Sequence, residues 1–243
     1  MTRQYPASMG IDRSRQNYLR KKEAFTGIED MTLLVPSYWL AERVKESFLK
    51  DYPVRVIYNG IDLDIYRPTP SDFRKKYHLE NKFVVLGVAN VWVERKGLST
   101  FLALADRLGE EYKIVLVGLS EGQLASLPAN VLGLPRTDTP EKLAQIYTAA
   151  DVFVNPSREE TFGLTVAEAM ACGTWPIVYA DTACAEVVKK GAGTIVTGDL
   201  AEIEKVIREC RKKGISGEME EAVTFFSKQR FGQEVLAVYE EKR

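Results

Sequence analysis

The chain has 243 residues, and its 33 lysines and arginines nearly balance its 34 aspartates and glutamates, for a formal net charge of −1. This balance indicates no nucleic-acid partner, since such proteins carry a basic excess. Hydrophobic residues make up 45% and charged residues 28% of the chain, which is typical of a globular protein and excludes an intrinsically disordered one.

No apolar run reaches the length that a membrane-spanning helix needs. The first apolar run, residues 31–35, is too short and too late for a signal peptide. The three cysteines, Cys172, Cys184 and Cys210, are odd in number and lack metal-ligand spacing, which suits a reducing compartment. We therefore expect a soluble, cytoplasmic protein.

The first 80 residues predict little regular structure. Residues 31–35 and 54–58 are the only convincing strands, and a helix is expected over 37–49 between them, with Ser37 as its cap. Two strands and one helix cannot form a doubly wound sheet of their own. We therefore expect this region to be the remnant of a larger domain.

From residue 83 onward, strand and helix patterns alternate. Continuous Val, Ile and Leu runs between amphipathic segments predict an α/β, Rossmann-like, doubly wound parallel sheet with helices on both faces. In such sheets, ligands bind at the carboxyl ends of the strands. Strands are expected over 83–89, 113–117, 130–134, 151–155, 176–179 and 193–196, and helices over 96–108, 140–150, 163–172, 182–190 and 199–212.

Two carboxylates flank the start of the predicted helix 163–172. Glu160 lies in the loop that follows the strand 151–155, and Glu168 follows it after seven intervening residues. Because side chains on a helix lean back toward its N-terminus, both carboxylates are predicted to face one small volume in front of the first turn. An acidic first turn explains Glu160 alone equally well. Glu168 is harder to explain in this way, because it stands in an apolar stripe where a carboxylate needs a partner.

The same volume receives backbone N–H groups that have no partner within the helix, with the positive end of the helix dipole behind them. A phosphate binds such amides, and sugar hydroxyls bind carboxylates. The ligand that needs both is a nucleotide sugar. The amides are those of Phe162, Gly163, Leu164 and Thr165.

The spacing of Glu160 and Glu168 resembles the Glu-x7-Glu signature of retaining glycosyltransferases with the GT-B fold, most closely family 4 of the bacterial polysaccharide-biosynthesis type. The resemblance implies that Glu160 bonds hydroxyls of the donor sugar and that Glu168 holds the ribose diol. It also implies that the sheet is the C-terminal, donor-binding domain of such an enzyme.

A second motif, Glu94-Arg-Lys-Gly97, resembles the Lys-Gly element of the family, whose lysine neutralises the donor diphosphate. This implies a catalytic role for Lys96 beside Glu160, although a solvated basic pair is the alternative. The family usually carries an Arg at the position that Asn90 occupies here. Either Arg95 substitutes for it in donor binding or the phosphate clamp is weaker, because Asn cannot make a bidentate phosphate contact.

The segment Asn59-Gly-Ile-Asp62 with Tyr66-Arg-Pro68 resembles the Asn-Gly-Val/Ile-Asp…Phe-x-Pro element that connects the two domains of the family. We therefore expect an N-terminally truncated member. Its expected parts are a remnant of the acceptor domain (1–67), the donor-binding domain (68–224) and a crossover helix (225–243).

The function implied is transfer of a hexose, with retention, from a UDP- or GDP-linked sugar to a glycan or lipid-linked acceptor, as in exopolysaccharide or O-antigen synthesis. The donor is a substrate, and no cofactor is expected. No metal is expected either, because turn chemistry explains Asp62-Leu-Asp64. Two alternatives remain: a catalytically silent nucleotide-sugar-binding fragment, and an epimerase or phosphorylase on the same scaffold.

A basic run near the start of the chain allows peripheral contact with anionic lipid, and a solvated helix face explains it equally well. Its residues are Arg13, Arg15, Arg20, Lys21 and Lys22.

Overall fold

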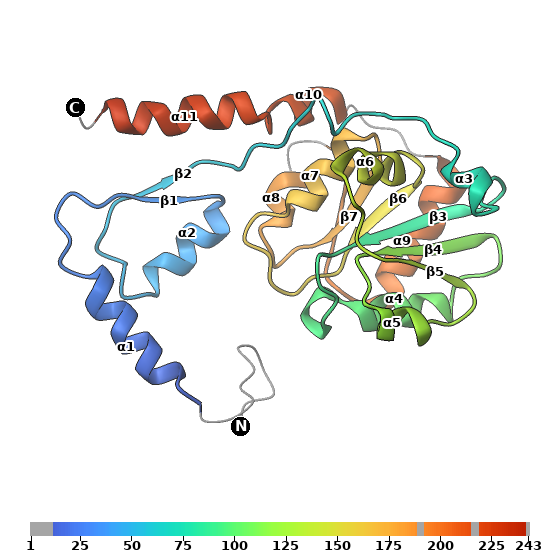
Figure 1. Ribbon diagram of the computed structural model, residues 1–243, viewed down its shortest axis with the longest axis horizontal. Helices are drawn as coiled ribbons and strands as arrows, with labels where there is room; N and C mark the ends of the chain where they lie inside the picture. The colour runs from blue at the N-terminus through green and yellow to red at the C-terminus, as the bar shows by residue number, and fades with distance from the viewer. Residues whose placement is uncertain (1–11, 189–191, 215–218, 242–243) are drawn as a thin grey trace. The chain divides into compact units, whose positions relative to one another are not determined.

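The computed structural model describes residues 12–188, 192–214 and 219–241 (Figure 1). The chain divides into two compact units, and the division falls between Val56 and Ile57.

The described part of the N-terminal unit, residues 12–56, contains two helices and a two-stranded parallel sheet in which β1 pairs with β2. Ser37 begins α2 as predicted, and its hydroxyl accepts a hydrogen bond from the amide of Leu40 at 3.0 Å. The helix α1 was expected only as one explanation of the basic run that begins at Arg13, because it buries no residue and so shows no apolar periodicity. The elements are α1 (Ser14–Phe25), β1 (Leu33–Val35), α2 (Tyr38–Lys45) and β2 (Val54–Val56).

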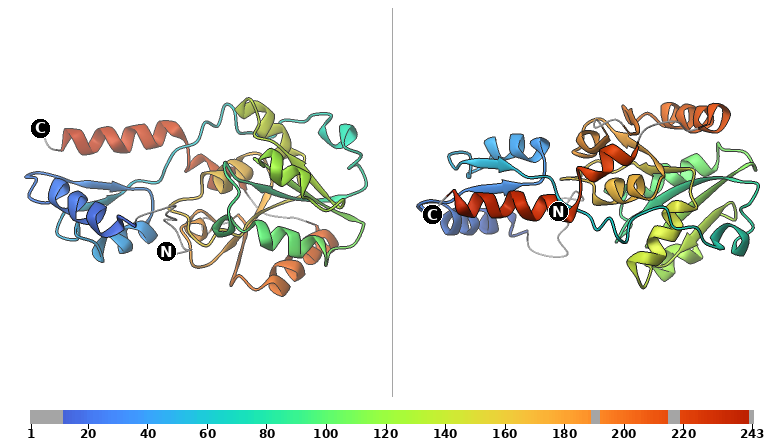
Figure 2. Two further views of the ribbon diagram at one scale, coloured as in Figure 1. Left: turned by 60° about the horizontal axis from the view of Figure 1, so that its bottom comes forward. Right: turned by 90° about the horizontal axis from the view of Figure 1, so that it is seen from above.

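The second unit is built on a six-stranded parallel sheet with the order β5-β4-β3-β6-β7-β8 (Figure 1; Figure 2). The chain starts at β3, winds outward to β5, crosses back to β6 and winds outward again to β8. This arrangement confirms the predicted α/β fold with a doubly wound parallel sheet. The strands are β3 (Phe83–Val88), β4 (Tyr112–Val117), β5 (Val131–Leu134), β6 (Val152–Asn155), β7 (Trp175–Tyr179) and β8 (Thr194–Val196).

Helices cover both faces of this sheet (Figure 1). Besides the main helices, a 3-10 helix, Glu94–Lys96, follows β3. The α-helices are α3 (Phe73–Lys76), α4 (Leu98–Ala105), α5 (Glu121–Ala125), α6 (Pro140–Thr148), α7 (Leu164–Ala171), α8 (Cys184–Val188), α9 (Leu200–Lys213), α10 (Met219–Thr224) and α11 (Lys228–Glu240).

The hydrophobic core follows from the alternation of side chains along the strands. Val84 and Leu86 of β3 pack in one cluster with residues of α6, α7 and α8. Val85, between them, packs in the other cluster with residues of α4 and α9. Successive side chains of a strand point to opposite faces, so a continuous apolar strand supplies both clusters.

Several helix predictions differ from the structure. The helix expected over 37–49 ends at Lys45, and the helix expected over 140–150 ends at Thr148. The helix expected over 96–108 is interrupted at Gly97, whose φ of 78° lies in the left-handed region, and α4 starts only after it. The short α5 was not predicted, although Ser120 and Gln123 form a capping box at its start.

Two further predicted helices extend beyond the described residues. Of the helix predicted over 182–190, α8 covers 184–188, and residues 189 and 190 lie outside the described residues. Of the segment expected as a helix over 225–243, α11 covers 228–240, and residues 242 and 243 lie outside the described residues.

The segment that enters the second unit runs beside the segment that leads into α11. The amide of Ile61 donates to the carbonyl of Phe226 at 2.7 Å, and the amide of Lys228 donates to the carbonyl of Ile61 at 3.0 Å. Asp62 and Lys228 form an ion pair at 2.6 Å. These bonds fix the start of the unit next to the beginning of its last helix.

Candidate functional site

The candidate site lies where β3 and β6 end, at the carboxyl edge of the sheet. The loop after β3 and the loop after β6 are joined by a hydrogen bond from the amide of Arg158 to the carbonyl of Arg95 at 3.0 Å. A Cβ on Gly97 would lie 2.6 Å from Cγ of Pro156, so only glycine allows the two loops to approach this closely.

Trp92 anchors the loop after β3. Its side chain is 4% exposed, and its indole N–H donates to the carbonyl of Val117 at 2.9 Å. Its ring packs edge-on against Phe101, with 5.5 Å between the ring centroids. The amide side chain of Gln123 donates to the carbonyl of Trp92 at 2.9 Å. The buried ring of Trp92 and the hydrogen bonds of its indole N–H and its carbonyl hold the loop in place. The backbone that leads to Lys96 is therefore fixed.

The loop after β6 is shaped by Gly163, which precedes the first residue of α7. Its φ is 97°, and a Cβ there would lie 2.6 Å from Sγ of Cys184. Burial, aided by the Glu160 carboxylate, raises the pKa of the Cys184 thiol to about 12. The thiol is therefore neutral and acts as a small packing group under the loop.

Lys96 and Glu160 form an ion pair, although 64 residues separate them in sequence. Their side chains retain 24% and 18% of their exposure, so both are partly withdrawn from water but still accessible. A lysine ammonium has three N–H donors. Lys96 can therefore hold Glu160 and offer further donors to an anion at the same time.

A pocket of about 380 Å³ opens beside this ion pair. Except for Glu168, every residue predicted for the site lines it, so the structure brings together two cations, one carboxylate and the first turn of α7. These lining residues are Asn90, Arg95, Lys96, Glu160, Phe162, Gly163, Leu164 and Thr165.

The pocket also has lining residues that the sequence analysis missed. Asn59 was interpreted only as part of the element that connects the two domains of the family, and the structure places it at the pocket. The others flank predicted residues and carried no separate signal. These lining residues are Asn59, Val88, Ala89, Val91 and Thr161.

Glu168 lies one turn further along α7 and does not line the pocket. The hydroxyl of Tyr147, on α6, donates to Oε2 of Glu168 at 3.1 Å, and the hydroxyl of Tyr66 also bonds this carboxylate. Burial raises the pKa of Glu168, and the two hydrogen bonds oppose this effect. The two carboxylates therefore do not share one cavity as expected, because Glu168 is held against two tyrosines.

Asn90, in the loop after β3, and Arg95, in the 3-10 helix, both line the pocket. The position that carries Arg in the family pattern is thus filled by an uncharged amide, and a second cation is supplied from a neighbouring position. Arg95 can make the planar, bidentate phosphate contact that Asn90 cannot.

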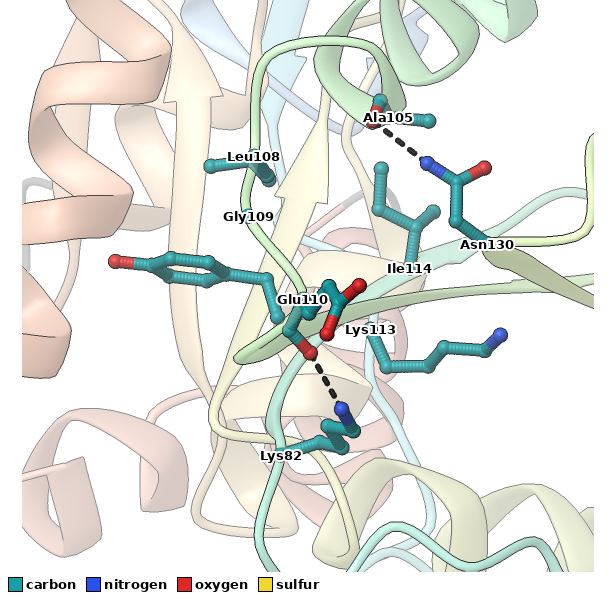
Figure 3. A pocket seen from close by; sticks show the side chains of 9 residues that line it. Lys82, Ala105, Leu108, Gly109, Glu110, Lys113, Ile114 and Asn130 are labelled. Atoms are coloured by element: carbon teal, nitrogen blue, oxygen red, sulfur yellow. Dashed lines mark hydrogen bonds between the residues drawn. The ribbon is translucent and has the colours of Figure 1, made fainter.

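A second cavity, of about 240 Å³, lies at the opposite, amino ends of β3, β4 and β5 (Figure 3). Lys82 donates to the carbonyl of Glu110 at 2.5 Å, and Asn130 donates to the carbonyl of Ala105 at 2.7 Å, as Figure 3 shows. Lys113 donates to the carbonyl of Ala129 at 3.2 Å. Each of these three side chains thus donates to a backbone carbonyl, an arrangement that stabilises the neighbouring loops.

Asp62, in the Asp62-Leu-Asp64 motif, is bonded to groups of the chain itself. Oδ1 of Asp62 accepts the amide of Asp64 at 3.1 Å, and Oδ2 pairs with Lys228 at 2.6 Å. Among the residues that the structure describes, no group of three His, Cys, Asp or Glu side chains could hold a metal ion. No helix within the same ranges has the length and apolar character needed to cross a membrane.

A protein-family model described as "Glycosyl transferases group 1" matches residues 70–222, which is more than half of the chain. The matched region contains the whole six-stranded sheet and every predicted site residue.

Curated relatives are similar to the chain over part of their length. An alpha-galactosylglucosyldiacylglycerol synthase of Streptococcus pneumoniae is 25% identical over 202 residues, which are 76% of this chain and 53% of that protein. A D-inositol 3-phosphate glycosyltransferase of Catenulispora acidiphila is 33% identical over 178 residues, which are 64% of this chain and 42% of that protein. The chain thus spans about half the length of these relatives.

Solved structures show the same fold. A sucrose-phosphate synthase from Thermosynechococcus elongatus superimposes with a TM-score of 0.78 at 24% identity, over 97% of this chain and 63% of that one. The Anabaena protein HepE, in complex with UDP and glucose, superimposes with a TM-score of 0.79 at 21% identity, over 93% of this chain and 67% of that one. At these identities, the similarity shows the fold alone.

Proposed function

Because the chain belongs to the glycosyl transferases of group 1, we propose that its second unit binds a nucleotide-diphosphate sugar and takes part in hexose transfer with retention of the anomeric configuration. One observation carries this proposal. Lys96, Arg95 and Glu160 meet the first turn of α7 in a single pocket at the carboxyl edge of the sheet.

The pocket suits the charges of such a donor. The diphosphate lies against the amides that begin α7, with Lys96 and Arg95 as counter-charges. When the bond to the sugar breaks, negative charge develops on the leaving diphosphate, and groups already in place stabilise it without reorganising. Glu160 accepts hydrogen bonds from sugar hydroxyls while it remains paired with Lys96, so the sugar is oriented relative to the diphosphate.

Glu168 is proposed to hold the ribose diol. It shares a helix face with Leu164, which lines the pocket, because residues four apart on a helix are neighbours. A nucleotide whose diphosphate lies at the start of α7 therefore brings its ribose to the second turn.

The nucleotide is proposed to be UDP or GDP, and the acceptor a lipid-linked or free glycan. The name of the pneumococcal relative specifies a diacylglycerol glycolipid, and the HepE structure contains UDP and glucose, which support a lipid-linked acceptor and a uridine donor. A role in exopolysaccharide or O-antigen assembly is one use of such a transferase.

Peripheral membrane contact is proposed through α1, where basic side chains lie beside exposed apolar ones. Tyr18, Leu19 and Phe25 are each about half exposed, at 51%, 53% and 49%. Sedimentation with vesicles of phosphatidylcholine alone or mixed with phosphatidylserine tests this contact. Binding only to the anionic vesicles supports it, and no binding to either overturns it.

The test of function is a transfer assay with the 243-residue chain, UDP- and GDP-hexoses, and diacylglycerol or glycolipid acceptors. We expect a product whose anomeric configuration, read from NMR coupling constants, equals that of the donor. Glu160→Gln should abolish transfer, whereas Glu111→Gln, near the amino ends of the strands, should leave it unchanged.

The other outcomes distinguish the alternatives. Donor binding without transfer or hydrolysis supports the silent nucleotide-sugar-binding module. Conversion of the donor sugar without an acceptor supports an epimerase. An inverted product contradicts retention.

A further inference from the structure

Glu168 is held by two aromatic side chains that come from different parts of the second unit. The hydroxyl of Tyr147, on α6, donates to Oε2 at 3.1 Å. The hydroxyl of Tyr66, in the segment before α3, lies close enough to the same carboxylate to lower its pKa. The two rings pack edge-on with 6.4 Å between their centroids, so each ring also fixes the other.

The surroundings leave the carboxylate little freedom. Tyr147 is 0% exposed, and the residues on either side of Glu168 in α7, Ala167 and Ala169, are also 0% exposed. A carboxylate in apolar surroundings depends on its hydrogen-bond donors, and the two hydroxyls supply them here. The donors therefore decide how the carboxylate is turned.

The number of acceptor positions allows a third partner. An ionised carboxylate has about four lone-pair positions for hydrogen bonds; Tyr147 occupies one of them, and Tyr66 approaches the carboxylate as a second donor. The positions that remain match the two hydroxyls of a ribose diol. Glu168 is partly exposed, so a ligand can reach them.

We propose that Tyr147 and Tyr66 are positioning residues, which hold the Glu168 carboxylate so that its free acceptor positions face the ribose diol of the bound nucleotide. This inference rests on the proposed function, because it assumes that a nucleotide occupies the pocket at the start of α7.

Both tyrosines remain donors under ordinary conditions. Burial, together with the charge of Glu168, raises the pKa of Tyr66 and of Tyr147 well above the usual value for a phenol. Neither hydroxyl therefore loses its proton near neutral pH, and the carboxylate always meets a donor on these sides.

Tyr66 offers a natural comparison. Tyr66→Phe removes the hydroxyl and keeps the ring that packs on Tyr147. Tyr147→Phe removes the buried hydroxyl that donates to Glu168 at 3.1 Å.

The experiment measures affinity for UDP and GDP and for their 2′-deoxy analogues by calorimetry. The ratio of the two dissociation constants, deoxy over ribo, reports the bond to the diol. We expect Tyr147→Phe to lower this ratio about three- to tenfold, the effect of one hydrogen bond, by weakening only the ribonucleotide. Tyr66→Phe should lower it in the same direction. Tyr112→Phe, near the amino ends of the strands, is the matched control and should leave the ratio unchanged.

The outcomes separate the inference from the function. If the wild type binds ribonucleotide and both tyrosine variants keep its ratio, the positioning role is wrong and the donor site stands. If the folded wild type binds no nucleotide, the proposed function fails and the inference with it. A change in both affinities by the same factor indicates a structural effect alone and overturns the positioning role. Should Tyr147→Phe not fold, Tyr66→Phe decides the outcome.

Discussion

The two ends of the six-stranded sheet carry lysines in opposite settings. At the carboxyl end, Lys96 pairs with the Glu160 carboxylate in a pocket that also contains the start of α7. At the amino end, Lys82 and Lys113 each donate to a backbone carbonyl. Both ends belong to one sheet, so the difference lies in the side chains and backbone groups of the loops at each end.

The comparison teaches that a cation near a cavity is not by itself a binding site. The carboxyl end adds amides at a helix start, a carboxylate and a second cation, all aimed at one volume. Parallel strands place successive loops together at this edge, which is why ligands of such folds are found there. If this contrast holds, substitutions at the carboxyl end should have large effects on donor binding or stability, and substitutions at the amino end small ones.

The largest effect is expected from Gly163→Ala, which alters the start of α7. Its φ of 97° is costly for alanine, and the new methyl group would meet Sγ of Cys184 at 2.6 Å. Backbone strain and overpacking together should lower the free energy of unfolding by about 2–4 kcal/mol. Urea unfolding measures this. Gly122→Ala, where nothing lies within 4 Å of the new atom, is the control and should be neutral or stabilising.

The second effect concerns the phosphate clamp. Arg95→Ala should weaken donor binding about tenfold, the value of one charge-assisted contact, and Asn90→Arg should strengthen it by a few-fold by restoring the family cation. Calorimetry with UDP- and GDP-sugars measures both. An Arg95→Ala variant that binds like the wild type would show that Lys96 and the amides suffice.

The third effect is a pH dependence of stability due to Glu168. Its folded pKa is raised above the ordinary value of 4.5, because burial outweighs the bonds from Tyr147 and Tyr66. The stability that Glu168 contributes is therefore fully present below about pH 4.5 and is lost as the pH rises through the folded pKa of this carboxyl. Cys172, which also faces this carboxylate, has a pKa raised to about 12 and stays neutral throughout.

Glu168→Gln removes this titration. The free energy of unfolding of the wild type, relative to the Gln variant, should fall as the pH is raised from 4 to 8 in urea unfolding experiments. A rising difference would show that the hydrogen bonds stabilise the carboxylate more than burial destabilises it, and a constant difference that the two effects cancel; either result contradicts the prediction.

The smallest effect is expected from Lys113→Ala at the amino end. Burial and the charge of Lys82 lower the pKa of Lys113, and its one hydrogen bond is to the carbonyl of Ala129. Its loss should change the free energy of unfolding by no more than about 0.5 kcal/mol. Donor affinity should stay as in the wild type. A weaker donor affinity would mean that the two ends of the sheet are not independent.

Local sequence patterns were sufficient to predict the sheet and most of the pocket. Apolar runs define the strands, and the positions of Lys96 and Glu160 relative to strand ends place them at one edge. Their direct pairing could not be predicted, because it depends on how two loops approach each other at Gly97 and Pro156.

The surroundings of Glu168 show where local patterns fail. The apolar stripe on α7 indicated that this carboxylate needs a partner, but nothing local identifies Tyr147 or Tyr66. Both partners are brought in by tertiary packing, from α6 and from the segment before α3. The interruption at Gly97 was missed for a similar reason, since an isolated glycine is tolerated in many helices.

The central claim is that the carboxyl edge of the sheet binds a nucleotide-diphosphate sugar. The most direct test is calorimetric titration of UDP-glucose and of GDP-mannose into the wild type, Lys96→Ala and Lys82→Ala. We predict that the wild type binds one donor, that Lys96→Ala weakens it about 10- to 100-fold, and that Lys82→Ala binds like the wild type. A folded wild type that binds neither donor, or equal losses in the two lysine variants, would contradict the account.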